Sequence, residues 1–447
     1  MSRSLRFQHI LTPGGMERHK RLIIDNQGLI TAIEDEPRED GQPFDGWVAL
    51  PGMPNAHSHC FQRALVGQGE RASGDDSFWS WREAMYGLAR DMSPENLRAV
   101  AARSFADMLR CGFTSVAEFH YLHHRADGSR GPEMAQAVIE GAAQAGIRLL
   151  LLPVLYQQGG FEQAAETRQQ RFVHESVDDY LSLLASLGPL PLGIAPHSLR
   201  AVGLPALKAL LAGADGLLPP GYAKHIHIAE QRQEVEACIE ASGVSPIELL
   251  ADAVELDGSW NLVHATHASE RELALIADAG ATVVLCPLTE AYLGDGIFPA
   301  REYRRLGGRF AIGSDSNVRI DAVEELRLLE YGQRLMLGRR ACLATEEGLG
   351  APLWRLAAVA GGAAMAQAVG EIKVGAYADL AVLDPLASPL AGLSIENVMD
   401  ALITAGSRQN ISATYVGGNR LVSEGSHFSE TEIQSAYSAA LKELASA

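Results

Sequence analysis

Two histidines one residue apart, His57 and His59, follow an apolar stretch in the sequence WVALPGMPNAHSHCFQR. If the strand predicted for this stretch continues through them, its period of two places both imidazoles on one face and Ser58 on the other. Two neutral imidazoles that face one point suit a divalent transition metal ion. The chain has 14 histidines, and two loop histidines after a strand would look the same. The pair therefore indicates a metal site only if other segments supply more ligands.

Polar and ionisable residues also end or follow the other short apolar runs of the chain. Examples are His225 and His227 within YAKHIHIA, with Glu230 three residues after His227, and Asp315 after RFAIGS. The remaining residues of this kind are Glu118, His120, Tyr121, Tyr156, His197, Arg200, His264, His267, Thr289 and Glu290. Such groups gather at the carboxyl ends of the strands in barrel enzymes. The repeated pattern strongly favours the metal site.

The elements that must position these residues are short strands that alternate with helices. Eight apolar runs cover residues 47–54, 114–119, 148–156, 191–196, 222–229, 260–265, 281–287 and 309–314. Nearly continuous apolar runs are typical of strands buried on both faces, as in parallel sheets. Helices are predicted between them, including one capped by Ser93 and one that begins at Asp321. Eight strand–helix repeats predict an α/β fold of the (β/α)₈ barrel type.

Both ends of the chain have a different pattern. They contain short β-like pieces between glycine turns, such as RLIIDNQGLITAIE, ADLAVLD and ATYVGGNRLVSEG. We therefore expect a small β domain built from residues 1–49 and 374–447, beside a catalytic barrel of residues 50–373.

The predicted ligands form a set of suitable size. His57, His59, His227 and Asp315 offer three nitrogens and one carboxylate oxygen and leave a position for water, which suits one catalytic Zn²⁺ per chain. A divalent ion can lower the pKa of bound water to about 7. Asp315 can then accept the water proton and Glu230 can carry it to a leaving nitrogen. His264 can polarise the substituents of the reacting carbon. His225 and His267 are interpreted as structural histidines.

Composition limits the possible partners. The formal net charge of −18 argues against nucleic acid and repels acidic molecules, so an anionic substrate would need local arginines. Five scattered cysteines without CxxC spacing are typical of reduced thiols in a cytoplasmic protein. The first residues lack the apolar core of a signal peptide, and no apolar stretch is long enough to span a bilayer. We expect a cytoplasmic protein with no membrane contact.

The segments PGMPNAHSH, HIHIAE, VHATH and IGSDS together resemble the amidohydrolase superfamily, and the resemblance includes both termini. The fourth strand, in PLGIAPHS, offers no lysine that could be carboxylated to bridge two metal ions. The remaining pattern is similar to the mononuclear deaminase branch. That resemblance implies His57, His59, His227 and Asp315 as metal ligands, and Glu230, His264 and Asp315 as catalytic residues.

Within that branch, the segments HSHCFQRAL, DSFWSWREAMYGLA, EFHYLHH and APHSLRAV resemble the N-formimino-L-glutamate deiminases of histidine degradation. The resemblance implies hydrolysis of the formimino group to N-formyl-L-glutamate and ammonia, and a homodimer. It also implies five substrate contacts, namely Gln62, Arg82, Tyr121, His197 and Arg200. Arginine holds carboxylates well, which agrees with a small dicarboxylate substrate in an acidic protein. A surface role for Arg82, stacked on nearby tryptophans, is the alternative for that residue.

Three other functions fit parts of the pattern. A deaminase of the same branch could act on guanine, a modified purine or a triazine, and its site would need a flat aromatic slot and amide-like hydrogen bonds rather than paired arginines. A binuclear amidase of the dihydroorotase type is disfavoured by the missing lysine. A metal-binding scaffold without catalysis would have no use for Glu230, His264 and Asp315 together.

Overall fold

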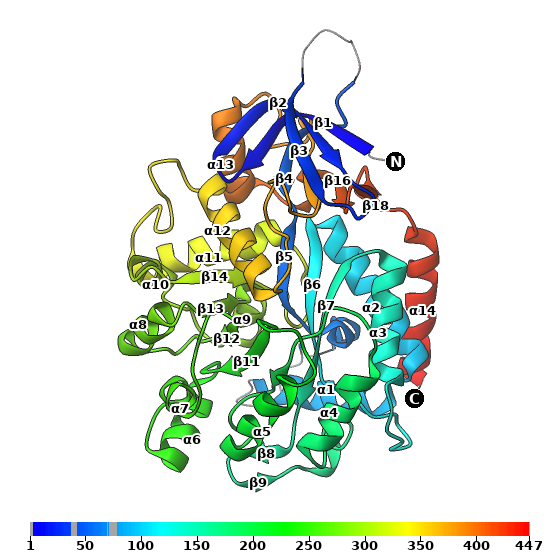
Figure 1. The fold of residues 1–447 in the computed structure, drawn as a ribbon, viewed down its shortest axis with the longest axis vertical. Coiled ribbons are helices and arrows are strands. Elements are labelled where there is room, and N and C mark those ends of the chain that lie inside the picture. The colour runs from blue at the N-terminus through cyan, green and yellow to red at the C-terminus, as the bar shows by residue number, and fades with distance from the viewer. Residues whose placement is uncertain (1–2, 37–42, 69, 71–77, 447) are drawn as a thin grey trace.

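The structure is a computed structural model that describes residues 3–36, 43–68, 70 and 78–446. Its centre is a barrel of eight parallel strands, in two four-stranded sheets joined by single bridges, Ser58 to Asp315 and Ile194 to Lys224. The barrel strands are β5 (Met53–Ser58), β6 (Phe113–His120), β7 (Arg148–Leu155), β10 (Ala195–Pro196), β11 (Lys224–Ile228), β12 (Trp260–His264), β13 (Thr282–Leu285) and β14 (Arg309–Ile312). The predicted (β/α)₈ barrel is confirmed (Figure 1).

Helices follow the barrel strands along the chain, and most of them cover the outside of the barrel (Figure 1). They are α1 (Phe78–Asp91), α2 (Pro94–Arg110), α3 (Glu133–Ala145), α4 (Val177–Ser186), α5 (Leu204–Ala214), α6 (Arg232–Ser242), α7 (Pro246–Ala253), α8 (Glu270–Asp278), α9 (Pro287–Leu293), α10 (Ala300–Arg305), α11 (Ala322–Leu337) and α12 (Gly350–Ala364). Both predicted helix starts are present. The Ser93 side chain accepts a hydrogen bond from the backbone N–H of Asn96, and Asp321 caps α11 through the N–H groups of Val323 and Glu324.

Strands from both ends of the chain form a separate eight-stranded sheet. In spatial order its strands are β18 (Ser426–His427), β17 (Asn419–Ser423), β16 (Ile411–Val416), β15 (Leu380–Leu383), β4 (Gly46–Pro51), β1 (Arg3–Thr12), β2 (Gly15–Ile24) and β3 (Ile30–Asp35). The sheet has its own apolar core, in which Phe7, Leu22 and Leu380 are fully buried. This arrangement supports the proposal of a small domain composed of residues 1–49 and 374–447.

The C-terminal segment also contains two helices that the sequence interpretation missed. Helix α13 (Ile395–Ala405) packs against α11, where the Tyr331 hydroxyl donates to the Thr404 carbonyl at 3.0 Å. Helix α14 (Glu430–Ser446) lies beside α2, where Arg103 donates to Glu430 at 2.7 Å (Figure 1). The C-terminal segment therefore covers part of the barrel as well as completing the small sheet.

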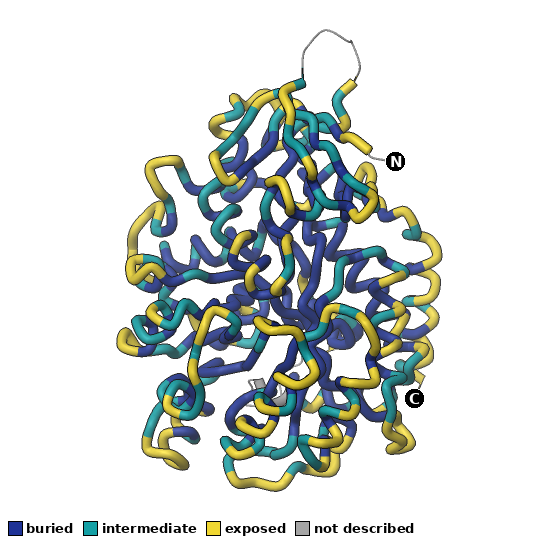
Figure 2. The backbone as a smooth tube through the Cα atoms, in the orientation of Figure 1, coloured by how far each residue is buried: buried dark blue, intermediate teal, exposed yellow. Residues whose placement is uncertain are grey.

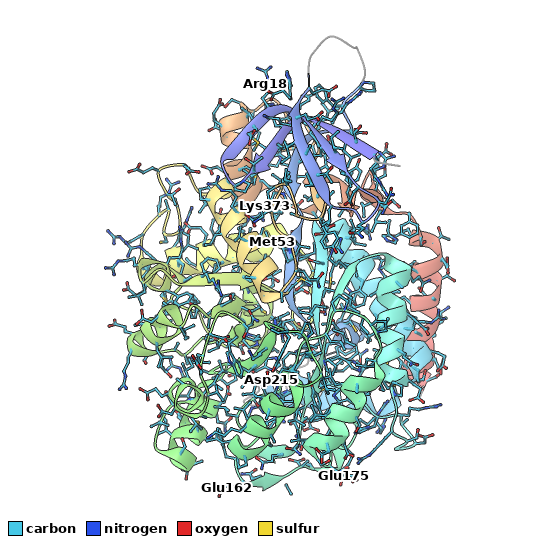
Figure 3. The ribbon with its side chains drawn as sticks, in the orientation of Figure 1. Arg18, Met53, Glu162, Glu175, Asp215 and Lys373 are labelled. Carbon is cyan, nitrogen blue, oxygen red and sulfur yellow. The ribbon has the colours of Figure 1, made fainter. Side chains whose placement is uncertain are left out.

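The barrel interior is the most deeply buried part of the molecule (Figure 2). Met53 begins β5 next to the small sheet, whereas Glu162 lies at the opposite end (Figure 3), in the hairpin of β8 (Gln158–Gly160) and β9 (Gln163–Ala164). The barrel strands run toward that second end, so their carboxyl ends open away from the small sheet. Among the described residues, no helix is both long and apolar enough to cross a membrane.

Candidate active site

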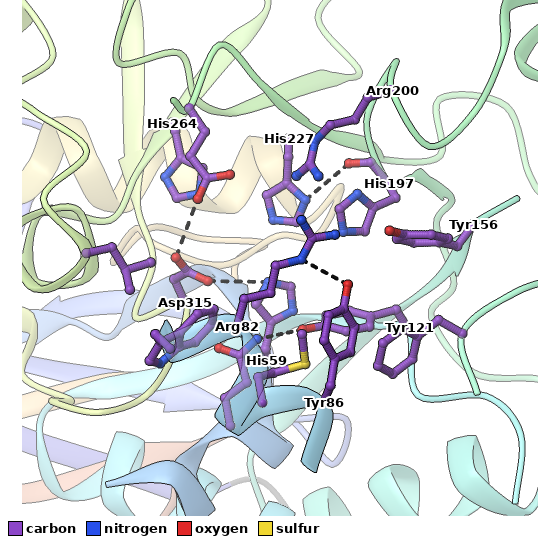
Figure 4. Close-up of a pocket in the computed structure, with 16 residues that line it drawn as sticks. His59, Arg82, Tyr86, Tyr121, Tyr156, His197, Arg200, His227, His264 and Asp315 are labelled. Carbon is purple, nitrogen blue, oxygen red and sulfur yellow. Dashed lines mark hydrogen bonds and ion pairs between the residues drawn. The ribbon is translucent and has the colours of Figure 1, made fainter. Parts of the chain in front are cut away.

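The carboxyl ends of the barrel strands surround one pocket that contains ten of the eleven predicted site residues (Figure 4). They are His59, Gln62, Arg82, Tyr121, His197, Arg200, His227, Glu230, His264 and Asp315. The eleventh, His57, has no exposed surface and lies beneath the pocket floor, in contact with the His59 and His227 rings. The structure therefore brings all predicted site residues together.

Three imidazoles and one carboxylate converge at this floor. The Nε2 atom of His57 lies 3.1 Å from Nε2 of His59 and 3.1 Å from Nε2 of His227. Asp315 Oδ1 lies 3.5 Å from the same atom of His57 and 3.3 Å from that of His59. Among the described residues, His57, His59 and His227 form one group that could hold a metal ion, and His57, His264 and Asp315 form an overlapping one.

The hydrogen bonds of these rings show that the donor set fits a cation. His59 Nδ1 lies 2.9 Å from the Phe119 carbonyl and His227 Nδ1 lies 3.1 Å from the His197 carbonyl, so each Nδ1 must carry the proton. The Nε2 atoms of both rings then present lone pairs toward His57. Metal-binding histidines are oriented in this way by carbonyl groups. His57 Nε2 has at most one hydrogen to share among these acceptors, so a cation between the rings would satisfy the lone pairs that remain.

The ionisation states suit a metal as well. Burial lowers the pKa of His57 to about 3, so its ring is neutral. Burial acts to raise the pKa of Asp315, but its hydrogen bond with His57 and the electrostatic effect of the surrounding histidines hold it below the usual value, so the carboxyl group is ionised. Neutral imidazoles and an ionised carboxylate are the forms that bind divalent ions.

Local backbone structure places Asp315 beside the histidines. Its N–H donates to the His57 carbonyl at 3.0 Å and its carbonyl accepts from the His59 N–H at 2.8 Å. The residue has a φ of 45°, and His264 has a φ of 70°, both in the left-handed region that side chains other than glycine rarely adopt. Strained backbone of this kind is concentrated at functional sites, where surrounding contacts enforce it.

Glu230 and His264 form the acid–base part of the site. Glu230 Oε1 lies 3.9 Å from Nε2 of His264, and Asp315 Oδ2 lies 3.7 Å from the same nitrogen. Glu290 lies 3.3 Å from the other ring nitrogen of His264. Burial alone would lower the pKa of His264, but Glu230, Glu290 and Asp315 raise it to about 10. The ring is thus a proton donor that faces the carboxylates around the pocket floor.

Glu230 lies just before helix α6, with its side chain directed into the pocket rather than capping the helix. The N-cap of α6 is Gln231, and the Glu230 side chain lines the pocket. Its backbone N–H donates to Glu234 at 3.0 Å, which fixes the turn. His225 agrees with its structural interpretation, because its Nε2 lies 2.8 Å from the Ala364 carbonyl in the core.

The five predicted substrate contacts line the same pocket. Gln62 donates to the Tyr121 hydroxyl at 2.6 Å, and Arg82 donates through Nε to the Tyr86 hydroxyl at 2.9 Å. Among the described residues, no carboxylate lies within ion-pair distance of the Arg200 guanidinium. Burial acts to lower the pKa of Arg200, but Glu234 and other nearby groups raise it, so the side chain stays charged. These are positive and hydrogen-bond-donating groups that suit an anion.

Several residues of the pocket were not predicted from the sequence. Tyr156 ends the third apolar run and Glu290 follows the seventh, so their positions carried a signal. Trp81, Tyr86 and Phe172 come from segments between strands, where no sequence pattern marks the side that faces the pocket. The missed pocket residues are Trp81, Met85, Tyr86, Tyr156, Phe172 and Leu293, with Glu290 in contact with His264.

Comparison with known proteins agrees with this arrangement. Residues 48–421 match the model of the amidohydrolase family. A formimidoylglutamate deiminase of Pseudomonas aeruginosa is 42% identical over 98% of both chains. The crystal structure of an amidohydrolase from Brucella melitensis superposes with a TM-score of 0.92 at 41% identity, over 99% of both chains.

A more distant structure has the same fold. An adenosine deaminase from Xanthomonas campestris, solved with bound zinc, superposes with a TM-score of 0.80 at 21% identity, over 99% of this chain and 98% of that one. The match to the family model covers most of the chain, and the relative from Pseudomonas aeruginosa spans nearly all of it. The protein belongs to the amidohydrolase family.

Proposed function

We infer that this protein hydrolyses N-formimino-L-glutamate to N-formyl-L-glutamate and ammonia. The observation that carries this inference is a single pocket with a metal-ligand cluster and Glu230 at its floor, and with Arg82 and Arg200 on its wall. The 42% identity to a formimidoylglutamate deiminase over nearly the whole chain supports the same substrate.

We propose one Zn²⁺ per chain, held by His57, His59, His227 and Asp315, because three imidazoles and one carboxylate are typical of a catalytic zinc site. When bound there, the ion would supply a water of lowered pKa as the nucleophile.

The cytoplasm is the proposed location, supported by five free cysteines. The resemblance to the deiminases supports a homodimer, which sedimentation analysis would test.

The side chains of the protein would move the protons of the reaction. Asp315 lies next to His57 and His59 and is ionised, so it can accept a proton from the attacking water. His264 carries a proton on the pocket side and can donate a hydrogen bond to the nitrogen of the formimino group. Glu230 lies 3.9 Å from His264 and can pass a proton to the departing nitrogen. Ammonia then leaves and the formyl group stays on the glutamate nitrogen.

The identity of the products is the direct test. Incubation with N-formimino-L-glutamate should release one ammonia per substrate consumed and leave N-formyl-L-glutamate, because the proton is delivered to the terminal nitrogen. Ammonia assay and mass spectrometry of the product would measure both. Formamide and glutamate as products would mean that the other C–N bond breaks. Turnover of guanine in place of the diacid would favour a purine deaminase.

The variant Arg200→Met should lower kcat/KM by about 30- to 4,000-fold, because a buried charge-paired hydrogen bond to a substrate carboxylate would be lost. Metal content should stay unchanged, since Arg200 is outside both potential ligand groups. Arg82→Met should have the same effect. Steady-state kinetics and metal analysis would measure both quantities.

A matched control is Arg271→Met, which removes an arginine whose side chain is 82% exposed on the outside of the barrel. Its kcat/KM and its metal content should equal those of the unmodified protein. Shortening the substrate by one methylene, to N-formimino-L-aspartate, should cost less than losing Arg200, because one carboxylate can still be held. If both pocket arginine variants keep normal kcat/KM, the dicarboxylate assignment is wrong.

A further inference from the structure

A buried glutamine behind the pocket, Gln169, joins two tyrosines of the pocket wall. It ends the short helix η3 (Thr167–Gln169) and is 1% exposed. Its Nε2 atom lies 2.8 Å from the Tyr156 hydroxyl, at the end of β7, and 3.2 Å from the Tyr86 hydroxyl, on α1. One side chain thus connects two hydroxyl groups from distant parts of the sequence.

The orientation of the Gln169 amide follows from its other contact. The backbone N–H of Glu166 donates to Gln169 Oε1 at 2.8 Å. A backbone N–H can only donate, so the atom that it faces must be the amide oxygen. The amide nitrogen, which has two hydrogens and no acceptor capacity, must therefore face the tyrosines. Both phenol oxygens consequently accept hydrogen bonds from Gln169.

Within the described residues, this arrangement leaves the hydroxyl hydrogens of both tyrosines without a protein acceptor. The Tyr86 oxygen also accepts from Nε of Arg82 at 2.9 Å, so two acceptor positions are filled and only its own O–H remains. Neither Tyr86 nor Tyr156 donates to a protein acceptor in the part of the chain that the structure describes. Burial raises the pKa of Tyr86, which keeps its proton in place.

Both hydroxyls belong to the wall that also carries the arginines. Tyr86, Tyr156, Arg82 and Arg200 line the same pocket, and the Tyr156 hydroxyl points toward its centre (Figure 4). Two phenol O–H groups and two guanidinium groups form a wall that donates hydrogen bonds. A carboxylate only accepts hydrogen bonds, whereas a carboxamide also needs an acceptor for its NH₂ group. Such a wall would favour the carboxylate.

We propose that Tyr86 and Tyr156 donate hydrogen bonds to a carboxylate of the substrate, and that Gln169 is the positioning residue that fixes both hydroxyls as donors. The proposal rests on the dicarboxylate substrate proposed above. It adds how the pocket selects a carboxylate over a carboxamide. The tyrosines bind a part of the substrate that does not react, so they affect ground-state and transition-state binding alike.

Kinetics of three variants test the proposal. Tyr86→Phe and Tyr156→Phe should each raise KM for N-formimino-L-glutamate, and the inhibition constant of glutarate, by about tenfold or more, with kcat within about threefold of normal. Gln169→Glu should have at least the same effect, because a carboxylate at that position accepts from both phenols and turns their hydrogens away from the pocket. The matched control Gln170→Glu makes the same change on the neighbouring exposed residue and should leave all constants unchanged.

A selectivity measurement distinguishes substrate binding from a purely structural role. One of the two monoamides of N-formimino-L-glutamate replaces the carboxylate that the tyrosines contact. In both phenylalanine variants, the preference for the diacid over that monoamide should fall. The proposal is overturned if all three variants keep KM and the glutarate constant within about twofold of normal. If Gln169→Glu does not fold, as judged by circular dichroism, the phenylalanine variants decide.

The two inferences fail in different ways. If the unmodified protein neither converts N-formimino-L-glutamate nor binds glutarate, the proposed function is wrong and the role of the tyrosines falls with it. If the unmodified protein does both and the variants do not differ from it, only the role of Tyr86, Tyr156 and Gln169 is wrong.

Discussion

The variants His227→Ala and Asp315→Ala are expected to lose the bound divalent ion and all measurable deiminase activity. Each removes one of four donors that converge within a few ångströms, with 3.1 Å between the Nε2 atoms of His227 and His57 and 3.3 Å from Asp315 to His59. Removing Asp315 also removes the only negative charge of the proposed ligand set. Metal analysis of the purified proteins and an ammonia-release assay would measure the two losses.

The controls for this prediction concern stoichiometry and folding. Unmodified protein should contain about one ion per chain, and adding Zn²⁺ after chelation should restore its activity but not that of the variants. Asp278→Ala, on the exposed face of α8, should keep both metal and activity. Two ions per chain would contradict the mononuclear site. Metal retention by both ligand variants would contradict the assigned ligands.

The barrel and most of the site could be predicted because both follow from simple periodic patterns. Strands buried on both faces have continuous apolar runs, and the residues that follow them meet at one end of a parallel barrel. His57, His227 and Asp315 are far apart in sequence, yet each lies within such a run or just after one. The pattern that predicts the fold therefore also predicts which side chains come together.

The less accurate predictions have identifiable physical reasons. The first run, 47–54, contains two strands, because the chain passes from β4 of the small sheet to β5 of the barrel within it. The fourth run gives only the two-residue strand β10, because prolines and a glycine within PLGIAP interrupt regular pairing. Neither the passage from β4 to β5 nor the interrupted pairing at β10 changes the apolar character of the run, so neither can be recognised from that pattern.

Two kinds of feature could not be predicted in this way. Helix α13 carries apolar residues at helical spacing, with Val398, Met399 and Leu402 buried, but its surroundings were interpreted as β structure. Tyr86 and Gln169 lie on connecting segments, and their contact depends on how those segments fold over the barrel end. Tertiary contact, rather than local pattern, decides which of their faces reaches the pocket.

The variant Glu230→Gln is expected to lower kcat by about 10²- to 10⁴-fold while metal content stays normal. Glutamine keeps the size and polarity of glutamate but cannot carry a proton. Glu230 lines the pocket 3.9 Å from Nε2 of His264, so its carboxylate lies where a proton must pass between water and the departing nitrogen. It is outside both groups of residues that could hold the metal, so the ion should remain.

The structure offers a matched control for this variant on the helix that follows. Glu236→Gln makes the same substitution on an exposed face of α6, and it should leave kcat and metal content unchanged. Pre-steady-state measurement of ammonia release would show whether the chemical step itself is slowed in Glu230→Gln, as loss of a proton carrier requires. Normal kcat in Glu230→Gln would mean that this carboxylate carries no proton in the reaction, and that His264 and Asp315 move the protons without it.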